Sequence, residues 1–288
     1  MHPYNYYAPE DINEAVGLLE EFGEKARCLA GGTDILVQTR EGKYELDAII
    51  DVKKIPELTK VDWTDEYLIV GSATPCFALY EDEKVNSKFP GIIDAASLIG
   101  GIQIQSRASL GGNLCNASPS ADGICPLIVH NTICVIVGSH GYREVPVDEF
   151  CVSPGNNILD SGEFLVSLKI PLPESGFGAS YERFIPRNEM DIAVAAVGSS
   201  VIVKEKKITD CKIALAAVGP TPIYAKNASE FLIGKDVSEG NLEEASEKAK
   251  NSCSPITDMR GNVDFRKHLI GVLTRRTLDL AIKRAGGN

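Results

Sequence analysis

The sequence predicts a fold of mixed helices and strands arranged in two domains. The chain has 288 residues, whereas a single domain usually has about 100–200. A helix pattern lies among strand patterns within residues 1–55, and a strand-rich block ends at Pro171 and Pro173, which mark a predicted domain boundary. The last third begins with strand patterns and ends with helix patterns.

The first helix is predicted to begin at about Asp11. Asp11 and Glu14 have the three-residue spacing of a capping box. The apolar residues that follow recur on one helix face: Ile12, Ala15, Val16 and Leu19. Gly23 is expected to end this helix.

Two strands and a short helix complete the N-terminal β-α-β unit. The first strand covers residues 26–30 and runs into a pair of glycines. Either Thr33 or Asp34 can cap a short helix that continues to Gln38. Residues 48–52 are predicted to form the second strand.

From about residue 60 the pattern favours strands interrupted by two helices. The helices are predicted after Thr74 and Pro75 and over residues 91–99, and glycine-rich turns are predicted around residues 109–123. Apolar, β-branched and aromatic residues predict four strands: residues 67–70, 133–137, 142–145 and 164–170.

The last third is predicted to form strands and then helices. The segment 192–203 is rich in alanine, but its Val/Ile-rich end, Gly198 and the polar turn 204–207 favour a strand over a helix. The other strands are expected at residues 179–184 and 212–218. Helices are expected at residues 225–233, 242–251 and 265–283.

The charge balance argues against nucleic acid or an anionic membrane as the main partner. Lys and Arg number 29 and Asp and Glu number 40, which gives a net charge of −11, whereas phosphate neutralisation needs a basic surface. The N-terminus lacks a basic stretch followed by an apolar core. No apolar run approaches the roughly 20 residues of a membrane span. A soluble, cytoplasmic protein is therefore expected.

Neither the cysteines nor the histidines predict a metal or cluster site. The eight cysteines include no Cys-x-x-Cys pair, and the four histidines are scattered. Without a secretion signal, free thiols that act as small apolar residues are expected rather than disulfides. Motifs of Rossmann, P-loop, serine-hydrolase and zinc-protease sites are also absent. No catalytic side chain is therefore proposed from the sequence.

Two glycine-rich segments are the informative motifs. The first, LAGGTDIL at Leu29 to Leu36, runs from a strand through two glycines into a helix start. Glycine lets the backbone approach a ligand and adopt positive φ. The N–H groups at a helix start attract an anion such as a pyrophosphate. Asp34 has a rival role as the cap of the helix.

The second segment, SLGGNLCNASPSAD at residues 109–122, pairs two glycines with hydroxyl and amide side chains. These side chains belong to Ser109, Asn113, Asn116 and Ser118. One glycine pair is typical of a plain turn, but two such segments favour a ligand that carries phosphate. Asp122 is either a turn residue or an acceptor for a ligand hydroxyl or ring N–H.

Six phrases of the sequence resemble the FAD subunits of molybdenum hydroxylases, and most of all the xanthine dehydrogenase type. They follow one another in the family's order over nearly the whole chain: LAGGTDILVQTR, AIIDVKKIPEL, IGGIQIQSRASLGGNLCNASPSADGICPLIV, NEMDIAVAAVG, AAVGPTPI and FRKHLI. The combination of AGGTD with GGN and ASPSAD is the most specific part. The C-terminal phrases distinguish members of the family less sharply.

This resemblance implies an α+β fold. An FAD-binding domain of the PCMH/vanillyl-alcohol-oxidase type would span residues 1–172, in two subdomains of about residues 1–55 and 56–172. A C-terminal domain, made of a small antiparallel sheet and helices, would cover residues 173–288.

The resemblance also implies an FAD site. The first glycine segment would wrap the pyrophosphate and ribityl chain, and the second would add backbone donors. Ile99 matches an apolar contact near the flavin, Asp122 an acid that holds FAD, Leu165 a packing residue and Arg183 a basic position. The implied cofactor-binding residues are Leu29, Ala30, Gly31, Gly32, Thr33, Asp34, Ile35, Leu36, Ile99, Ser109, Leu110, Gly111, Gly112, Asn113, Asp122, Leu165 and Arg183.

Two departures from the family bear on this site. Gln105 stands where many relatives have a basic residue, which removes a charge from a contact with FAD or a partner. Ser109 replaces the usual threonine but keeps the hydroxyl. Residues 187–192 match a mobile loop that borders the flavin in relatives. The cysteine-rich insertion of the hydroxybenzoyl-CoA reductase type is absent, so no iron–sulfur cluster is expected in this chain.

The function implied by the resemblance is electron transfer. Partner subunits would hold the molybdopterin and two [2Fe–2S] clusters, and this chain would carry the FAD that reduces NAD⁺. The alternatives are the FAD subunit of a nicotinate, aldehyde or carbon monoxide dehydrogenase, a self-contained flavin oxidoreductase, a scaffold that has lost FAD, and a site for another nucleotide. The molybdenum subunit chooses the substrate, so this sequence does not name it.

Overall fold

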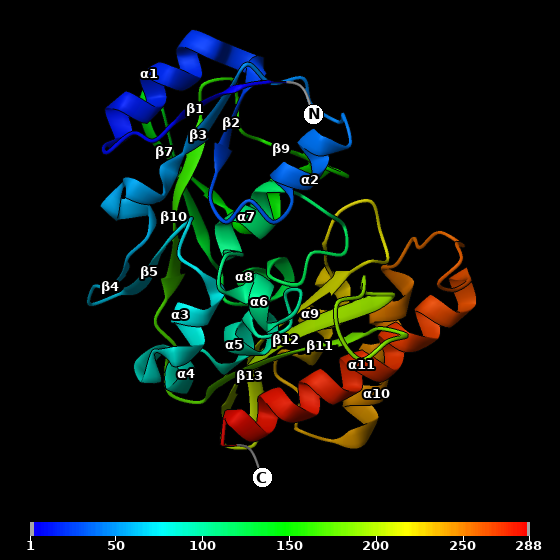
Figure 1. The fold of residues 1–288 in the computed structure, drawn as a ribbon. Helices are drawn as coiled ribbons and strands as arrows, with labels where there is room; N and C mark the ends of the chain where they lie inside the picture. Colours follow the sequence, from blue (N-terminus) through cyan, green and yellow to red (C-terminus); the bar gives the residue numbers. More distant parts are fainter. Residues whose placement is uncertain (1–2, 287–288) are drawn as a thin grey trace.

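The computed structural model describes residues 3–286, which form three units arranged one after another (Figure 1). The N-terminal unit lies at the top of Figure 1 and a central unit of sheet and short helices lies below it. A C-terminal sheet with the longest helix, α11, lies at the lower right. The arrangement confirms the predicted α+β fold class.

The N-terminal unit is built on a three-stranded parallel sheet in the order β1-β3-β2. The strands are β1 (Asn5–Tyr7), β2 (Ala26–Leu29) and β3 (Ala48–Asp51). Helix α1 (Ile12–Phe22) lies between β1 and β2, and α2 (Ile35–Arg40) lies between β2 and β3. The sequence pattern missed β1, which is only three residues long.

Helix α1 begins and ends where its local sequence predicts. The Asp11 carboxylate accepts a hydrogen bond from the Glu14 N–H at 2.9 Å, which is the capping contact. The Glu14 carboxylate turns to the Glu10 N–H instead of to Asp11, so the capping box is not closed. Gly23 ends the helix with a φ of +52°. The predicted apolar face packs on the sheet beside Ala48 and Ile50.

The central unit contains a five-stranded antiparallel sheet in the order β4-β5-β10-β6-β7. Its strands are β4 (Val61–Trp63), β5 (Tyr67–Gly71), β6 (Ile133–Gly138), β7 (Gly141–Pro146) and β10 (Phe164–Pro171). A small hairpin joins β8 (Cys151–Ser153) to β9 (Asn156–Asn157). Four of the five sheet strands follow the sequence prediction, and β4 was not expected.

Short helices pack on one another beside this sheet. They are α3 (Cys76–Glu81), α4 (Glu83–Lys88), α5 (Pro90–Ala96), α6 (Ile102–Gln105), α7 (Leu110–Cys115) and α8 (Ile124–Val129). The prediction of glycine-rich turns around residues 109–123 was wrong for α7, because Gly111 and Gly112 lie inside that helix. Ser109 caps it by accepting a hydrogen bond from the Gly112 N–H at 3.0 Å, which offsets the poor helix propensity of glycine.

The C-terminal unit is a four-stranded antiparallel sheet in the order β11-β12-β13-β14, covered by helices. Its strands are β11 (Phe177–Phe184), β12 (Ala195–Lys204), β13 (Lys207–Ala216) and β14 (Ile223–Tyr224). The alanine-rich segment is therefore a strand, as predicted. The helices are α9 (Lys226–Leu232), α10 (Glu239–Asn251) and α11 (Val263–Arg284).

Two carboxylates of the central unit hold β11 of the C-terminal unit. Asp94 accepts hydrogen bonds from the Tyr181 backbone N–H at 3.1 Å and from the Arg284 guanidinium at 2.6 Å. Asp122 accepts from the Tyr181 hydroxyl at 2.6 Å and from Arg183 at 2.5 Å. The largest hydrophobic cluster also continues from the central helices into the C-terminal sheet. The two units are therefore packed as one body.

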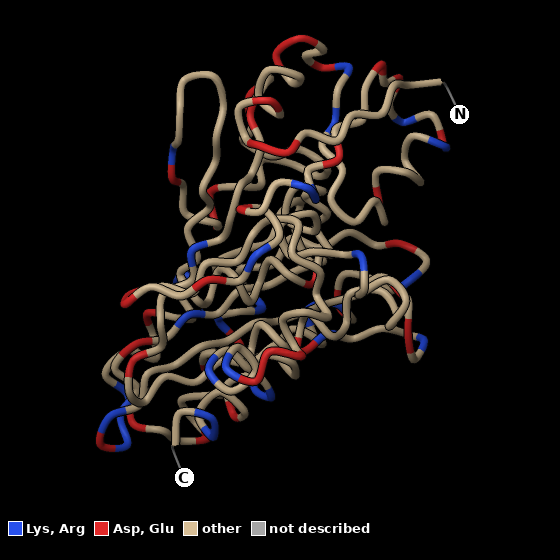
Figure 2. The backbone as a smooth tube through the Cα atoms, turned by 60° about the vertical axis from the view of Figure 1, so that its left-hand side comes forward, with Lys and Arg blue, Asp and Glu red and all other residues tan. Residues whose placement is uncertain are grey.

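The charged residues are spread over the surface, and the cysteines form no disulfides among the described residues. Figure 2 shows Lys and Arg scattered among Asp and Glu over the described chain rather than gathered on one face. All eight cysteines are free, as expected. Among residues 3–286, no helix has the length and apolar character needed to cross a membrane.

His130 is buried between the central and C-terminal units. Its ring lies between the rings of Phe89 and Phe177, with centroids 5.9 and 5.3 Å away. The Nδ1–H donates to the Pro126 carbonyl at 2.7 Å, whereas Nε2 has no partner. Burial lowers the pKa of His130 from 6.5 to about 4.

This environment predicts a loss of stability in acid. The unfolded chain takes up a proton at His130 below about pH 6.5 and the folded chain does not, so stability falls as the pH drops toward 4. Between pH 7 and 5, His130→Gln should remove about 2 kcal/mol of the pH-dependent change in unfolding free energy. Urea unfolding at both pH values measures this.

The matched control is His140→Gln, because His140 is exposed in the β6–β7 turn. It should leave the acid dependence as in the wild type. An unchanged acid dependence in His130→Gln would show that the buried imidazole is not the group that titrates.

Candidate functional site

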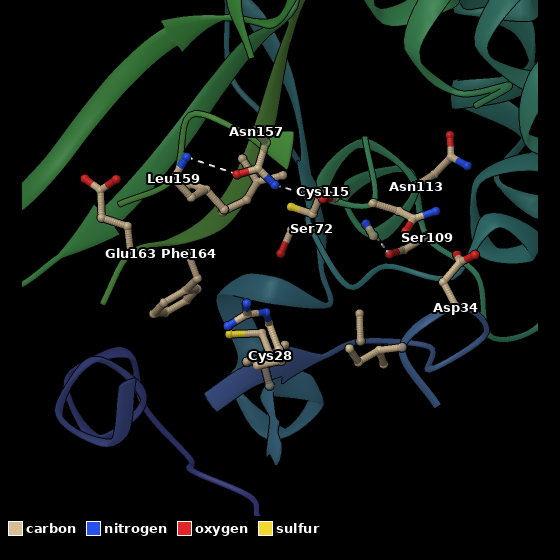
Figure 3. A pocket seen from close by; sticks show the side chains of 18 of the residues that line it. Cys28, Asp34, Ser72, Ser109, Asn113, Cys115, Asn157, Leu159, Glu163 and Phe164 are labelled. Carbon is tan, nitrogen blue, oxygen red and sulfur yellow. Dashed lines mark hydrogen bonds between the residues drawn. The ribbon is translucent and has the colours of Figure 1, made fainter. Parts of the chain in front are cut away.

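A cavity of about 550 Å³ lies between the N-terminal and central units. Three stretches of chain form most of its wall: residues 26–38 around the β2–α2 loop, residues 108–116 of α7 and its start, and residues 155–165 before and within β10. Figure 3 shows Asp34, Ser109 and Asn113 gathered on one side and Glu163 and Phe164 on the other.

The β2–α2 loop offers a run of backbone donors. From Gly31 to Ile35, five successive N–H groups donate to no acceptor within residues 3–286. Gly32 has a φ of +80°, and the helix hydrogen bonds begin only at the Leu36 N–H. Successive N–H groups in such a turn form a nest that binds an anion. The local geometry is therefore that of a phosphate-binding loop.

The glycines of both segments serve close packing of the backbone. A Cβ at Gly31 would overlap the carbonyl of Arg107, and a Cβ at Gly111 would overlap the backbone of Ser72. The sequence argument assigned these glycines to the approach of a ligand. In the structure, Gly31 and Gly111 instead let the two segments and the end of β5 meet, and Gly32 alone needs positive φ.

The second segment packs against the first on the same side of the cavity. The first N–H groups of a helix have no partner within the helix. In α7 the Gly111 N–H has no acceptor in the described chain, whereas the Leu110 N–H belongs to the bridge that pairs Ser109 with Pro75. The Asn113 side chain accepts from the Gly123 N–H at 2.9 Å. The Gln38 amide donates to the Asn116 side chain at 2.8 Å and ties α2 to the end of α7.

Asp34 is placed in the cavity but does not cap α2. It occupies the cap position, yet its side chain accepts no hydrogen bond from the helix. Thr33 does not cap α2 either. Burial raises the pKa of the Asp34 carboxyl, and the nearby Lys43 opposes this. The carboxyl remains available to a ligand hydroxyl.

Most of the residues predicted for the site are brought together. Those that line the cavity are Ala30, Gly31, Gly32, Thr33, Asp34, Ile35, Ile99, Ser109, Gly111, Gly112, Asn113 and Leu165. Leu29, Leu36 and Leu110 flank it without lining it. Leu110 is buried in the central core and Leu36 is partly exposed.

Asp122 and Arg183 lie outside the cavity wall and pair with each other. Both side chains are at least nine-tenths buried, and their contact measures 2.5 Å. Burial raises the pKa of Asp122 to about 6, against the effect of the Arg183 charge and the Tyr181 hydroxyl. Asn113, which accepts from the Gly123 N–H, links the cavity to this pair. Contact of either residue with FAD remains a prediction.

Gln105 does not line the cavity and is not exposed at the protein surface. It is buried, its amide N–H donates to the Ser97 carbonyl at 2.7 Å, and its amide oxygen accepts from the Tyr80 hydroxyl at 3.3 Å. These bonds hold the turn that carries Ile99. Because no carboxylate is among these partners, a neutral amide satisfies this position.

An ion pair within the loop joins the two ends of residues 187–192. Arg187 pairs with Asp191 at 3.1 Å, and Met190 has a φ of +50°. Met190 also lies against Gly101, where an added Cβ would sit 3.3 Å from the sulfur. The loop therefore approaches the turn that follows Ile99.

In the third wall of the cavity, residues 155–165, only Leu165 was predicted from the sequence. Asn157 holds this wall: its amide donates to the Cys115 carbonyl at 2.8 Å, and its amide oxygen accepts from the Leu159 N–H at 3.0 Å. Figure 3 shows Asn157 beside Cys115. The phrase SPGNN signals a turn, but nothing in it indicates that this turn reaches α7.

Two family models match the chain. The "FAD binding domain in molybdopterin dehydrogenase" matches residues 2–173, and the "CO dehydrogenase flavoprotein C-terminal domain" matches residues 180–281.

Similar proteins match over almost their full length. A xanthine dehydrogenase FAD-binding subunit of Escherichia coli O157:H7 is 30% identical over 98% of this chain and 97% of the relative. The carbon monoxide dehydrogenase medium chain of Hydrogenophaga pseudoflava is 29% identical over 98% of each. Among solved structures, carbon monoxide dehydrogenase from Hydrogenophaga pseudoflava has a TM-score of 0.95 at 29% identity, over 99% of both chains.

The positive φ of Gly32 and its place in the cavity wall predict that Gly32→Ala lowers the amount of bound FAD. Gly32 and Gly42 both have a φ of +80°, but only Gly32 lines the cavity, and a Cβ at Gly42 would meet open space. Alanine at either position should cost about 1–2 kcal/mol of stability, because left-handed backbone disfavours a side chain. Only Gly32→Ala should also lose bound FAD, measured as the ratio of flavin to protein after purification.

Gly42→Ala is therefore the control for backbone strain. Equal flavin content in the two variants would contradict the assignment of the β2–α2 loop to the cofactor.

Proposed function

Because the chain belongs to the FAD-binding family of molybdopterin dehydrogenases, we propose that it is the electron-transfer subunit of a molybdenum hydroxylase complex. The observation that carries the proposal is the run of five unsatisfied N–H groups beside a cavity of about 550 Å³. This donor set fits the pyrophosphate of FAD, and the cavity volume lies in the range of ligand and cofactor sites.

The residues of this chain have binding and shielding roles in the proposal. The N–H groups from Gly31 to Ile35 bind the pyrophosphate, and the Gly111 N–H at the start of α7 adds one donor. Ile99 and Leu165 contribute apolar wall, and the Asp122–Arg183 pair lies outside that wall, behind Asn113 and Gly123. Bound FAD supplies the redox chemistry itself. The chain needs no acid or base of its own for this task.

We propose that the other cofactors lie on partner subunits. Electrons would come from [2Fe–2S] clusters of one partner and originate at the molybdopterin of another. In residues 3–286, no group of three or more His, Cys, Asp or Glu side chains could hold a metal ion. Similarity to medium chains and FAD-binding subunits of named dehydrogenases supports a multi-subunit assembly. A cytoplasmic location is part of the same proposal.

The first candidate is a xanthine dehydrogenase type of subunit, for which NAD⁺ is the proposed final electron acceptor. The second candidate is a subunit of the carbon monoxide dehydrogenase type. The first rests on similarity to xanthine dehydrogenase FAD-binding subunits. The second is supported equally, by 29% sequence identity and a TM-score of 0.95. No residue described in the site decides between them, so the acceptor has to be measured.

We also propose two domains, residues 1–172 and 173–288. The matches of the two family models and the separate sheets support this division. The shared hydrophobic cluster across the boundary means that the two domains would not move independently.

The purified chain should show a flavin absorption spectrum, release FAD on denaturation and be bleached by NADH. Bleaching by NADH supports the NAD⁺ acceptor, because electron transfer between flavin and nicotinamide is reversible. FAD that NADH does not bleach would keep the subunit assignment and move the acceptor elsewhere. A colourless protein that refuses added FAD, alone and with its partner subunits, would contradict the proposed function.

A further inference from the structure

Two cations hold successive carbonyl groups of the β2–α2 loop. The Lys53 ammonium donates to the Ala30 carbonyl at 2.8 Å, and the Arg107 guanidinium donates through Nε to the Gly31 carbonyl at 3.2 Å. Neither Lys53 nor Arg107 lines the cavity. Both cations therefore reach the loop from behind its cavity wall.

Because the peptide bond is planar, these contacts to carbonyl oxygens also fix the directions of the N–H groups that follow. In a trans peptide, the C=O of one residue and the N–H of the next point in opposite directions. Fixing the Ala30 carbonyl therefore orients the Gly31 N–H, and fixing the Gly31 carbonyl orients the Gly32 N–H. These are the first two of the five donors that have no acceptor in the described chain.

Lys53 is itself held by a partly buried network. The Asp51 carboxylate accepts from the Lys53 ammonium at 2.6 Å and from the Lys53 backbone N–H at 3.0 Å. Its other oxygen accepts from the Tyr6 hydroxyl at 2.6 Å. Asp51 ends β3 and pairs in register with Leu29, the last residue of β2. The phrase IIDVKK thus places an ammonium beside the carbonyl from which the glycine loop starts.

We propose that Lys53 and Arg107 are positioning residues for the pyrophosphate, and that they act through the peptides of the β2–α2 loop. This inference rests on the proposed function. Each cation fixes one carbonyl away from the cavity and adds positive charge behind the donors. In a chain with a net charge of −11, these charges also offset the repulsion of a dianionic ligand.

The experiment measures affinity for FAD and for riboflavin, which lacks the pyrophosphate, by flavin fluorescence with the full-length chain. Lys53→Met and Arg107→Gln should each weaken FAD binding about tenfold or more, as expected for loss of a charge-assisted hydrogen bond. Riboflavin binding should stay unchanged. Lys53→Arg keeps both charge and donors and should recover most of the FAD affinity.

Lys54→Met is the matched control, because Lys54 is exposed and lies 3.6 Å from Glu10 rather than near the loop. It should bind both ligands as the wild type does. Arg107 is exposed, so Arg107→Gln does not put the fold at risk. Equal weakening of FAD and riboflavin, or FAD affinity within twofold of wild type in both variants, would overturn this inference alone. A wild-type chain that binds no FAD would overturn the proposed function as well.

Discussion

The close approach of backbone segments at Gly31 and Gly111 is the constraint on which the rest of the site depends. At these two positions a side chain would overlap the backbone of Arg107 or Ser72. With glycine there, the loop after β2, the start of α7 and the end of β5 meet around one cavity. The residues Gly31 to Ile35 line this cavity, and their N–H groups have no acceptors among residues 3–286. The proposed pyrophosphate site would depend on this packing as well as on the cations behind the loop.

Polar contacts also join the central unit to the C-terminal unit. Asp94 and Asp122 reach from the central unit to Tyr181 in β11, and α11 returns Arg284 to Asp94. A cofactor held between the first two units would therefore stand at a fixed place relative to the third. A subunit that relays electrons needs this rigidity, because its cofactor must keep a constant position toward its partners.

Local sequence signals predicted the regular elements and the segments of the site, but not their contacts. The Asp11 cap and the apolar face of α1 are encoded within residues 11–22, and the glycine segments are visible as motifs. The pairing of Asp122 with Arg183 spans 61 residues of sequence, and that of Gln38 with Asn116 spans 78. No local pattern encodes such contacts. Glycine propensity alone favours a turn at residues 110–115, but the Ser109 cap and the packing of Gly111 against Ser72 make this segment the helix α7.

A crystal structure of the chain with FAD tests the central claim most directly. The account predicts pyrophosphate oxygens within about 3.2 Å of the N–H groups of Gly31 to Ile35, as expected for N–H···O hydrogen bonds. The start of α7 should lie beside the pyrophosphate. A pyrophosphate bound elsewhere, with these five N–H groups facing water, would contradict the account.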